Sequence, residues 1–250
     1  MIRNNAMKRS VILIVSILLF SLTSCNAATE TPLYSSGFSQ SSTVLSQSGF
    51  DYEVTNDGVR ITKCWNYGRE IIIPDEIDGK SVKIIADEAF YQHTDTESII
   101  LPESLTTIEG SPFYRCYSLS KILIPQNVDT ITYNPFYRCS SLTKITVATE
   151  NANYCDEYGV LFDKDKTVLI AYPEGNTAET YTVPDSVREI MDDAFGYRCV
   201  NLKTIVIRSN VTVFPDYNIF INSDQITLMV ESGSIAEQYA KKYKLRFEIL

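Results

Sequence analysis

The sequence contains one histidine, His93, and no motif that would make it catalytic. A catalytic histidine needs a nucleophile and an orienting acid beside it, and the chain has no G-x-S-x-G or comparable pattern. No C-x-x-C pair occurs among the six cysteines, so nothing supports a zinc site. The acidic residues are scattered, and Asp163-x-Asp165 lacks the glycine and the distal glutamate of an EF-hand loop. We therefore predict no catalytic residue, no metal ligand and no cofactor.

Positive charge is also scarce, because 22 Lys and Arg stand against 31 Asp and Glu, for a net charge of −9 at pH 7. Nucleic-acid binding depends on neutralising phosphates, so an acidic chain is a poor candidate for it. Glycine is sparse for a β-rich chain, with 10 residues, whereas the side chains that build a core are abundant. The chain is long enough for one elongated domain or one large globule.

No apolar run is long enough to span a bilayer as a helix. The stretch 11–22 is too short for that, but it follows Arg3, Lys8 and Arg9 and has the layout of a cleaved signal peptide. It ends in the letters LTSC at 22–25, which resemble the lipobox of bacterial lipoproteins. This resemblance implies that residues 1–24 are removed and that Cys25 becomes the lipidated N-terminus. The alternative is an ordinary signal peptide whose cysteine is incidental.

Residues 25–50 are predicted to be a disordered tether that begins at the lipidated cysteine. Seven serines and one charged residue, Glu30, fall within 26–50, without apolar periodicity. We expect an exported chain that is anchored to a bacterial membrane by lipid and exposed at the cell surface.

An internal repeat of about 23 residues fills the rest of the chain. Residues 99–121 read IILPESLTTIEGSPFYRCYSLSK, and residues 122–144 read ILIPQNVDTITYNPFYRCSSLTK. Further copies occupy 181–204 and 205–227, and an early copy with an insertion starts at 71. Apolar residues recur in the same columns of every copy, among them a Phe column at Phe90, Phe113, Phe136 and Phe195. One such turn cannot bury its own apolar edges, so stacked turns must bury each other, with parallel strands on one face.

The strand-Pro start, the Val/Leu and Ile columns, the Ala-Phe step and the Cys-x-x-Leu close resemble the bacterial BspA-type leucine-rich repeat family. The resemblance covers about residues 50–250, although the chain has a proline after the strand and no convincing asparagine ladder. The predicted fold class is a β-rich leucine-rich-repeat solenoid, a right-handed coil with one parallel sheet face and an irregular convex side. For some family members the resemblance implies adhesion or host and matrix interaction.

Both ends of a solenoid need caps, since the core is otherwise exposed. Residues 51–70 are assigned to an N-terminal cap whose Asn56-Asp57-Gly58 turn predicts a β-hairpin. Residues 232–250 form a C-terminal cap, in which the capping-box pattern Ser234-x-x-Glu237 starts a short helix that a final strand follows. Repeats are assigned to 71–148 and 181–231, with an enlarged coil between them, at 149–180, that carries a β-hairpin.

One column holds Cys116, Cys139 and Cys199, with His93 at the same position of the earliest copy. Cys116 and Cys139 belong to adjacent turns and come within disulfide reach, and an exported protein permits the bond. The alternative is a ladder of buried free thiols that fills an apolar column. His93 is interpreted as a structural residue of this column.

Two surfaces are candidates for binding a partner. The first is the outward row of the sheet strands, an apolar stripe of the kind that marks interaction sites. Its residues are Ile72, Ile100, Leu123, Thr146, Thr182, Val206 and Met229. Strand propensity on a solvated sheet is the alternative explanation. The second surface is the convex side, where Tyr and Arg, which are favoured at interfaces, follow the Phe column. Its residues are Tyr114, Arg115, Tyr137, Arg138, Tyr197 and Arg198. Stacking between coils is the alternative there.

These observations predict a non-catalytic binding module on a bacterial surface, with a protein or another cell-surface component as its ligand. An envelope scaffold that binds the cell's own surface proteins or polysaccharide is an alternative, and an enzyme with an unrecognised site is another. We expect a monomer that binds no nucleic acid and reaches the membrane through its lipid.

Overall fold

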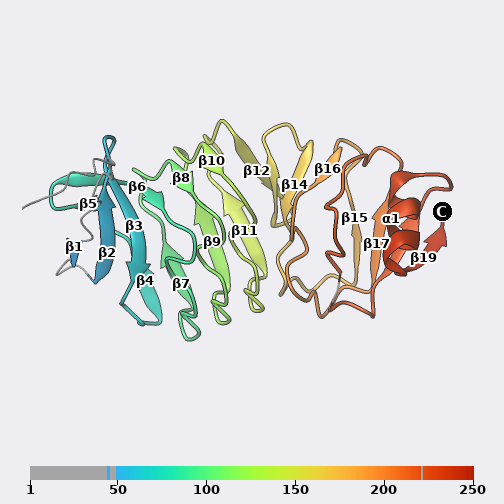
Figure 1. Cartoon of the computed structure of the whole chain (residues 1–250), viewed down its shortest axis with the longest axis horizontal. Coiled ribbons are helices and arrows are strands. Elements are labelled where there is room, and N and C mark those ends of the chain that lie inside the picture. Colours follow the sequence, from blue (N-terminus) through green and yellow to red (C-terminus); the bar gives the residue numbers. More distant parts are fainter. Residues whose placement is uncertain (1–43, 46–48, 221) are drawn as a thin grey trace, which may run out of the picture. The chain divides into compact units, whose positions relative to one another are not determined.

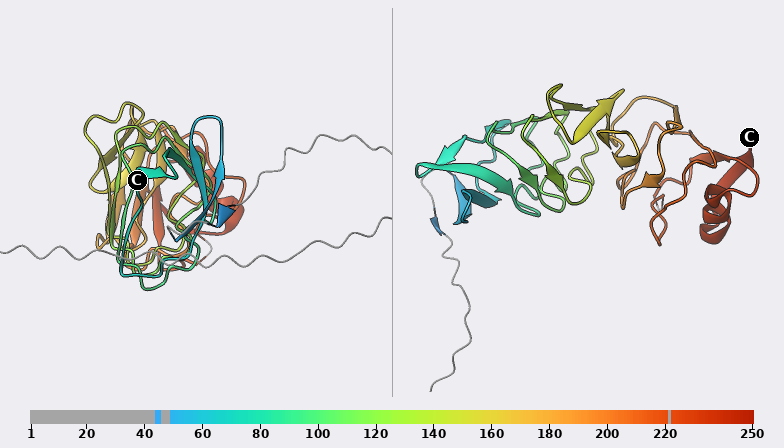
Figure 2. Two further views of the ribbon diagram at one scale, coloured as in Figure 1. Left: turned by 90° about the vertical axis from the view of Figure 1, so that its left-hand side faces the viewer. Right: turned by 90° about the horizontal axis from the view of Figure 1, so that it is seen from above.

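The structure is a computed structural model, and it describes residues 44–45, 49–220 and 222–250. The predicted signal peptide, Cys25 and most of the predicted tether lie outside these residues. The described part is a β-rich solenoid, as predicted, whose successive coils are joined by parallel strand pairing (Figure 1). The coils overlap when they are seen along the stack (Figure 2).

Antiparallel strands close the N-terminal end. β2 (Phe50–Val54) and β3 (Val59–Cys64) form the predicted hairpin. β1 (Val44–Leu45) pairs antiparallel with β2 and lies inside the segment that we predicted to be the tether. Strand pairing therefore starts before residue 50. β1 covers an edge of β2 that the hairpin alone would leave open.

The first strand of each coil belongs to one of two parallel sheets, and a proline follows this strand in the copies that contain Pro74, Pro102, Pro125 and Pro184. Four of these strands form one parallel sheet in the order β11-β9-β7-β4. They are β4 (Glu70–Ile72), β7 (Ser98–Ile100), β9 (Lys121–Ile124) and β11 (Lys144–Val147). The later coils build a second sheet with the order β15-β17-β18-β19. Its strands are β15 (Thr180–Thr182), β17 (Thr204–Ile207), β18 (Thr227–Val230) and β19 (Arg246–Ile249).

The early coils also have a second strand, so the prediction of one sheet face is incomplete. In the early coils these strands extend the sheet of the N-terminal hairpin, in the order β3-β6-β8-β10. They are β6 (Lys80–Ile85), β8 (Thr107–Ile108) and β10 (Thr130–Ile131), with β5 (Glu76–Ile77) antiparallel to β6. The Ile column residues Ile85, Ile108 and Ile131 lie on these strands, in register with their neighbours.

The enlarged coil separates the two sheets of first strands. It contains the predicted hairpin, β13 (Val160–Asp163) and β14 (Val168–Ala171), and a third strand that the sequence did not predict, β12 (Tyr154–Glu157). β14 then pairs parallel with β16 (Glu189–Ile190), which joins the hairpin to the second line of strands.

The predicted apolar columns form the core. The rings of Phe90, Phe113 and Phe136 follow one another with centroids 5.4 and 5.6 Å apart. The Val/Leu and Leu columns are buried in every copy, whereas Tyr181 and Phe214 are only half-buried. The buried apolar residues fall into two clusters, and the enlarged coil contributes to both.

A short helix caps the C-terminal end, as predicted. α1 (Ile235–Tyr243) begins after Ser234, whose Oγ accepts the backbone N–H of Glu237 at 3.1 Å. The Glu237 carboxylate accepts the N–H of Gly233, the residue before the N-cap, at 2.7 Å, so the capping residues predicted from the sequence both hold the start of the helix. The Tyr239 hydroxyl ties the helix to the last coil by donating to the Tyr217 carbonyl at 2.6 Å. β19 then adds the predicted final strand.

Candidate functional site

Three large apolar side chains stand exposed on the first sheet. Ile72, Ile100 and Leu123 lie on β4, β7 and β9 and are 61, 46 and 50 % exposed. Strand alternation places them there, because the residue before each and the residue after it point into the core. Ile72 and Ile100 are in register, and Leu123 is in register with Thr146 of β11. The early half of the predicted stripe is therefore a contiguous surface, which we call the apolar face.

The stripe does not continue as one surface along the chain. Thr146 is half-buried, because the hairpin of the enlarged coil packs against β11, where the Ile145 N–H donates to the Gly159 carbonyl at 3.0 Å. The later members, Thr182, Val206 and Met229, are in register with one another on the second sheet. Of these only Thr182 is exposed, whereas Val206 and Met229 are half-buried, so the large exposed apolar side chains of the stripe belong to the first sheet.

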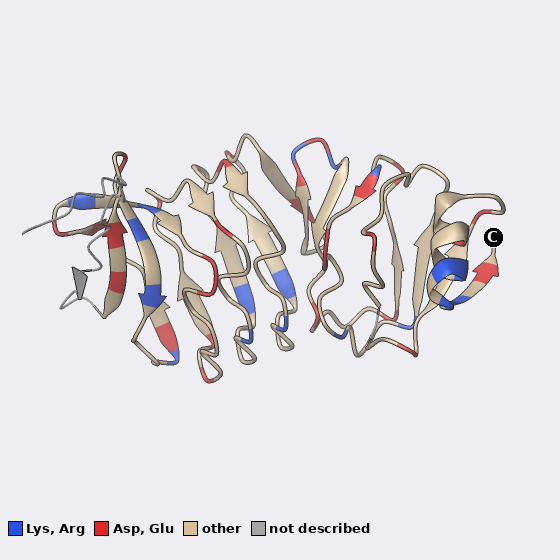
Figure 3. Cartoon of the chain, viewed as in Figure 1, with Lys and Arg blue, Asp and Glu red and all other residues tan. Residues whose placement is uncertain are grey.

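A groove of about 510 Å³ runs over the apolar face. Ile100, Leu123 and Pro125 line it. Lys121 begins β9 and Glu103 follows the end of the parallel strand β7, so these two lining residues belong to opposite ends of the strands. Lys121 and Lys144 begin β9 and β11, where Figure 3 shows the positive charge of this sheet, and Glu70 begins β4. The apolar face thus has a positive rim over two of its four strands.

The Tyr-Arg pairs predicted on the convex side lie in the turns that follow the Phe column, and we call this surface the turn side. The pairs stack on one another. The ring centroids of Tyr114 and Tyr137 lie 5.6 Å apart, and those of Tyr137 and Tyr197 lie 6.2 Å apart. The Arg138 guanidinium lies 3.5 Å from the centroid of the Tyr197 ring, at cation–π distance, and Arg115 lies 5.1 Å from that of Tyr114. Arg198 is exposed. These contacts agree with the coil-stacking explanation, because they hold the ladder residues against neighbouring coils.

The cysteine column is a column of free thiols. Cys116 and Cys139 are buried and unbonded to each other, and each donates to the carbonyl of a Phe in the preceding coil, Phe90 and Phe113 respectively. Burial raises the pKa of the Cys116 thiol to about 12, so this sulfur is not a nucleophile at neutral pH. The column therefore serves packing.

His93 is buried at the head of this column. Its ring stacks on Tyr67 with centroids 4.6 Å apart, and Nδ1 lies 2.9 Å from the Phe90 carbonyl oxygen. Burial lowers the pKa of the imidazole, so it is neutral at pH 7. Within 49–220 and 222–250, no group of three or more His, Cys, Asp or Glu side chains is placed to hold a metal ion. The contacts of His93 are those of a structural residue.

A buried carboxylate, which sequence analysis did not single out, joins the coils on either side of the hairpin. Glu174 is 4 % exposed, and its Oε1 accepts the backbone N–H of Arg138 and that of Tyr197, each at 2.7 Å. One coil earlier, the Arg115 N–H donates to a carbonyl, that of Tyr137, at 3.2 Å. Glu174 therefore supplies the acceptor that a regular coil would provide through its backbone.

Desolvation raises the pKa of Glu174 to about 7, although the backbone N–H groups and the Arg138 guanidinium oppose this shift. Gly196 leaves room for the carboxylate, because a Cβ there would lie 2.2 Å from Oε1. Gly196 also has a φ of 60°, which favours glycine. A second link across the hairpin runs from the Tyr133 hydroxyl to Asp193 at 2.8 Å. These contacts are structural links between coils.

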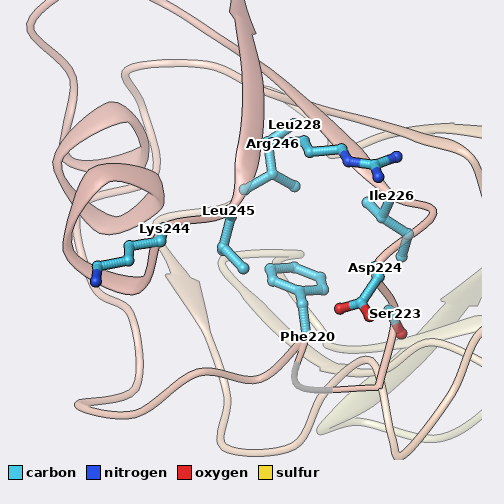
Figure 4. Close-up of a pocket in the computed structure, with 8 residues that line it drawn as sticks. All are labelled: Phe220, Ser223, Asp224, Ile226, Leu228, Lys244, Leu245 and Arg246. Atoms are coloured by element: carbon cyan, nitrogen blue, oxygen red, sulfur yellow. The ribbon is translucent and has the colours of Figure 1, made fainter.

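A smaller pocket of about 230 Å³ lies between the last coil and the C-terminal cap (Figure 4). Phe220, Leu228 and Leu245 line its inner part, and Asp224 and Arg246 also contribute. Its lining is half polar, and its apolar residues Ile226 and Leu228 are buried core residues of the last coil, so we regard it as a gap beside the cap.

The fold and these surfaces define a stacked-repeat protein with one exposed apolar sheet face. In the described ranges, no helix has the length and apolar character needed to cross a bilayer. The chain belongs to the BspA-type leucine-rich repeat family, whose repeat matches residues 67–162 and 171–237 in six copies. The gap between the matches falls on the hairpin of the enlarged coil.

Several solved structures are similar to this chain. A leucine-rich repeat protein of T. pallidum is 20 % identical, with 81 % of this chain and 96 % of that chain covered and a TM-score of 0.48. A leucine-rich cell surface protein of Faecalibacterium prausnitzii is 16 % identical, with 82 % and 77 % covered and a TM-score of 0.39. A leucine-rich repeat protein of Eubacterium ventriosum is 16 % identical, with 75 % and 72 % covered and a TM-score of 0.38. Among curated protein sequences, none matches the chain.

Proposed function

We propose that this protein is a non-catalytic binding module, displayed outside a bacterial cell, whose apolar face contacts a protein partner. The observation that carries the proposal is the exposure of Ile72, Ile100 and Leu123 on adjacent strands of one sheet. Contiguous apolar surface is costly in water and marks interaction sites on soluble proteins. The strands that present it are fixed by the core, so the surface needs little ordering when it binds.

The turn side is the weaker candidate surface. Its tyrosines already contact one another and the arginines of the same ladder. A partner that bound there would have to compete with contacts that hold the coils together. The side chains of Ile100 and Leu123 do not hold the coils together in this way, because they point away from the core.

We also propose that the chain is held at the membrane by lipid on Cys25. The support is the sequence LTSC at 22–25 behind a basic and apolar leader. Cys25→Ser should abolish metabolic incorporation of radioactive palmitate in the producing bacterium, because the thiol is the acceptor of the lipid. Cys155→Ser is the control and should keep the label. Undiminished labelling of C25S would exclude this anchor.

Replacing Leu123 by glutamate should abolish capture of the partner. The full chain, solubilised in detergent, would be immobilised and incubated with extracellular-matrix extract and, separately, with envelope extract of the producing bacterium. We expect at least a tenfold loss of the retained protein with Leu123→Glu, because a charge in the apolar face must be desolvated on binding. Retention is measured by quantitative mass spectrometry.

Val200→Glu is the matched control, because Val200 is 51 % exposed and lies on the turn side, away from the apolar face. Retention from the matrix extract supports adhesion, and retention from the envelope extract supports a scaffold within the envelope. If L123E and V200E retain the same partner equally well, the apolar face is not the binding surface.

A further inference from the structure

Lys121 and Lys144 form an unbalanced pair of charges on the rim of the apolar face. They are in register on β9 and β11, at the spacing of neighbouring strands, about 4.8 Å. Neither ammonium group has a carboxylate within ion-pair distance in the described part of the chain. Glu97 of the preceding coil is paired with Arg69 instead. Like charges in register destabilise a sheet, so the two lysines are electrostatically unsatisfied in the free protein.

The two sheets differ in this row, since only the first has two cations on adjacent strands among the described residues. The corresponding row of the second sheet consists of Thr180, Thr204 and Thr227, followed by Arg246. The chain as a whole is acidic, with a net charge of −9. Repeat geometry therefore does not require these lysines, and the overall charge makes two adjacent unpaired cations unusual.

The lysines and the apolar side chains project from the same side of the sheet. Lys121 and Leu123 are both exposed and are two residues apart on one strand, which spans about 6.6 Å. An extended peptide has the same interval between its own residues i and i+2. Glu103, at the opposite end of the strands, disfavours a second acidic group there and so sets the direction of a bound segment.

We propose that the groove binds an extended protein segment in which an acidic residue lies two positions from a leucine or isoleucine. The carboxylate contacts Lys121 and Lys144, and the aliphatic side chain lies against Ile100 and Leu123. This inference rests on the proposed function, since it names the kind of partner that the apolar face accepts.

Binding of three labelled peptides to the full chain tests the proposal. The peptides are fluorescein-Ser-Thr-X-Thr-Leu-Thr-Leu-Ser, where X is Glu, Gln or Lys, and their binding is measured by fluorescence anisotropy at low salt. We expect the Glu peptide to bind about tenfold more tightly than the Lys peptide, with the Gln peptide between them. The preference should shrink as salt is added, because the rim is exposed to solvent.

Lys121→Glu should reverse the order of the Glu and Lys peptides. Lys80→Glu is the control, since Lys80 is exposed on β6 and the charge change is the same, and it should leave the order intact. Equal binding of the three peptides, binding of none of them at millimolar concentration, or an order that K121E does not change would overturn the inference. Self-association of the chain that Leu123→Glu abolishes, without peptide binding, would also overturn it in favour of a second copy. The proposed function would still stand if L123E lost its captured partner.

Discussion

Phe113→Ala should lower the free energy of unfolding by about 3–5 kcal/mol, as expected for the loss of a buried aromatic side chain. Phe113 is fully buried, and its ring lies between those of Phe90 and Phe136 in the coils on either side. In a stacked-repeat protein this substitution weakens two interfaces at once, because each coil is stabilised by its neighbours. Urea denaturation followed by circular dichroism measures the change.

Tyr117→Ala is the control for this prediction. Tyr117 lies in the same turn but is exposed, so its removal should cost less than about 1 kcal/mol. If the two variants were destabilised equally, the phenylalanine column would not be the core that joins the coils.

Glu174 should make stability depend on pH between about 5 and 7. Burial raises the pKa of this carboxyl from 4.5 to about 7, so between these values the folded state holds a proton that the unfolded state has released. Below the unfolded pKa, Glu174 is protonated in both states and costs no stability. As the pH rises through the folded pKa, the free energy of unfolding falls by on the order of 3 kcal/mol in total. Glu174→Gln has no proton to release, so its stability relative to wild type should rise by about 2–3 kcal/mol from pH 5 to pH 8, because part of the change lies below pH 5.

Urea denaturation at both pH values checks this expectation, because the difference between variant and wild type isolates the one group. Parallel pH profiles for wild type and E174Q would show that Glu174 does not carry a raised pKa in the folded protein.

The solenoid could be predicted because each copy repeats the same physical requirement. A single turn cannot bury the apolar residues of its own Phe and Leu columns. They become buried only when the next turn supplies the same columns. The caps could be predicted for a similar reason, since Asn56-Asp57-Gly58 and Ser234-x-x-Glu237 are local signals that need no knowledge of distant contacts.

The enlarged coil could not be predicted in full, because its structure depends on contacts outside the repeat. Glu174 looks like an exposed turn residue beside Gly175, and its burial follows from the missing backbone acceptor for Arg138. The break in the apolar stripe has the same origin, since only the folded hairpin shows that Thr146 is half-buried. Sequence columns identified the outward positions, but not which of them stay exposed.

Hydroxyl-radical footprinting of the chain with its captured partner tests the central claim most directly. Radical oxidation reports the exposure of individual side chains, and Ile100, Leu123, Tyr91 and Tyr117 are all exposed in the free protein. If the apolar face is the binding surface, the partner should protect Ile100 and Leu123 and leave Tyr91 and Tyr117 of the turn side as reactive as before. Protection of Tyr91 and Tyr117 with unchanged oxidation of Leu123 would contradict it.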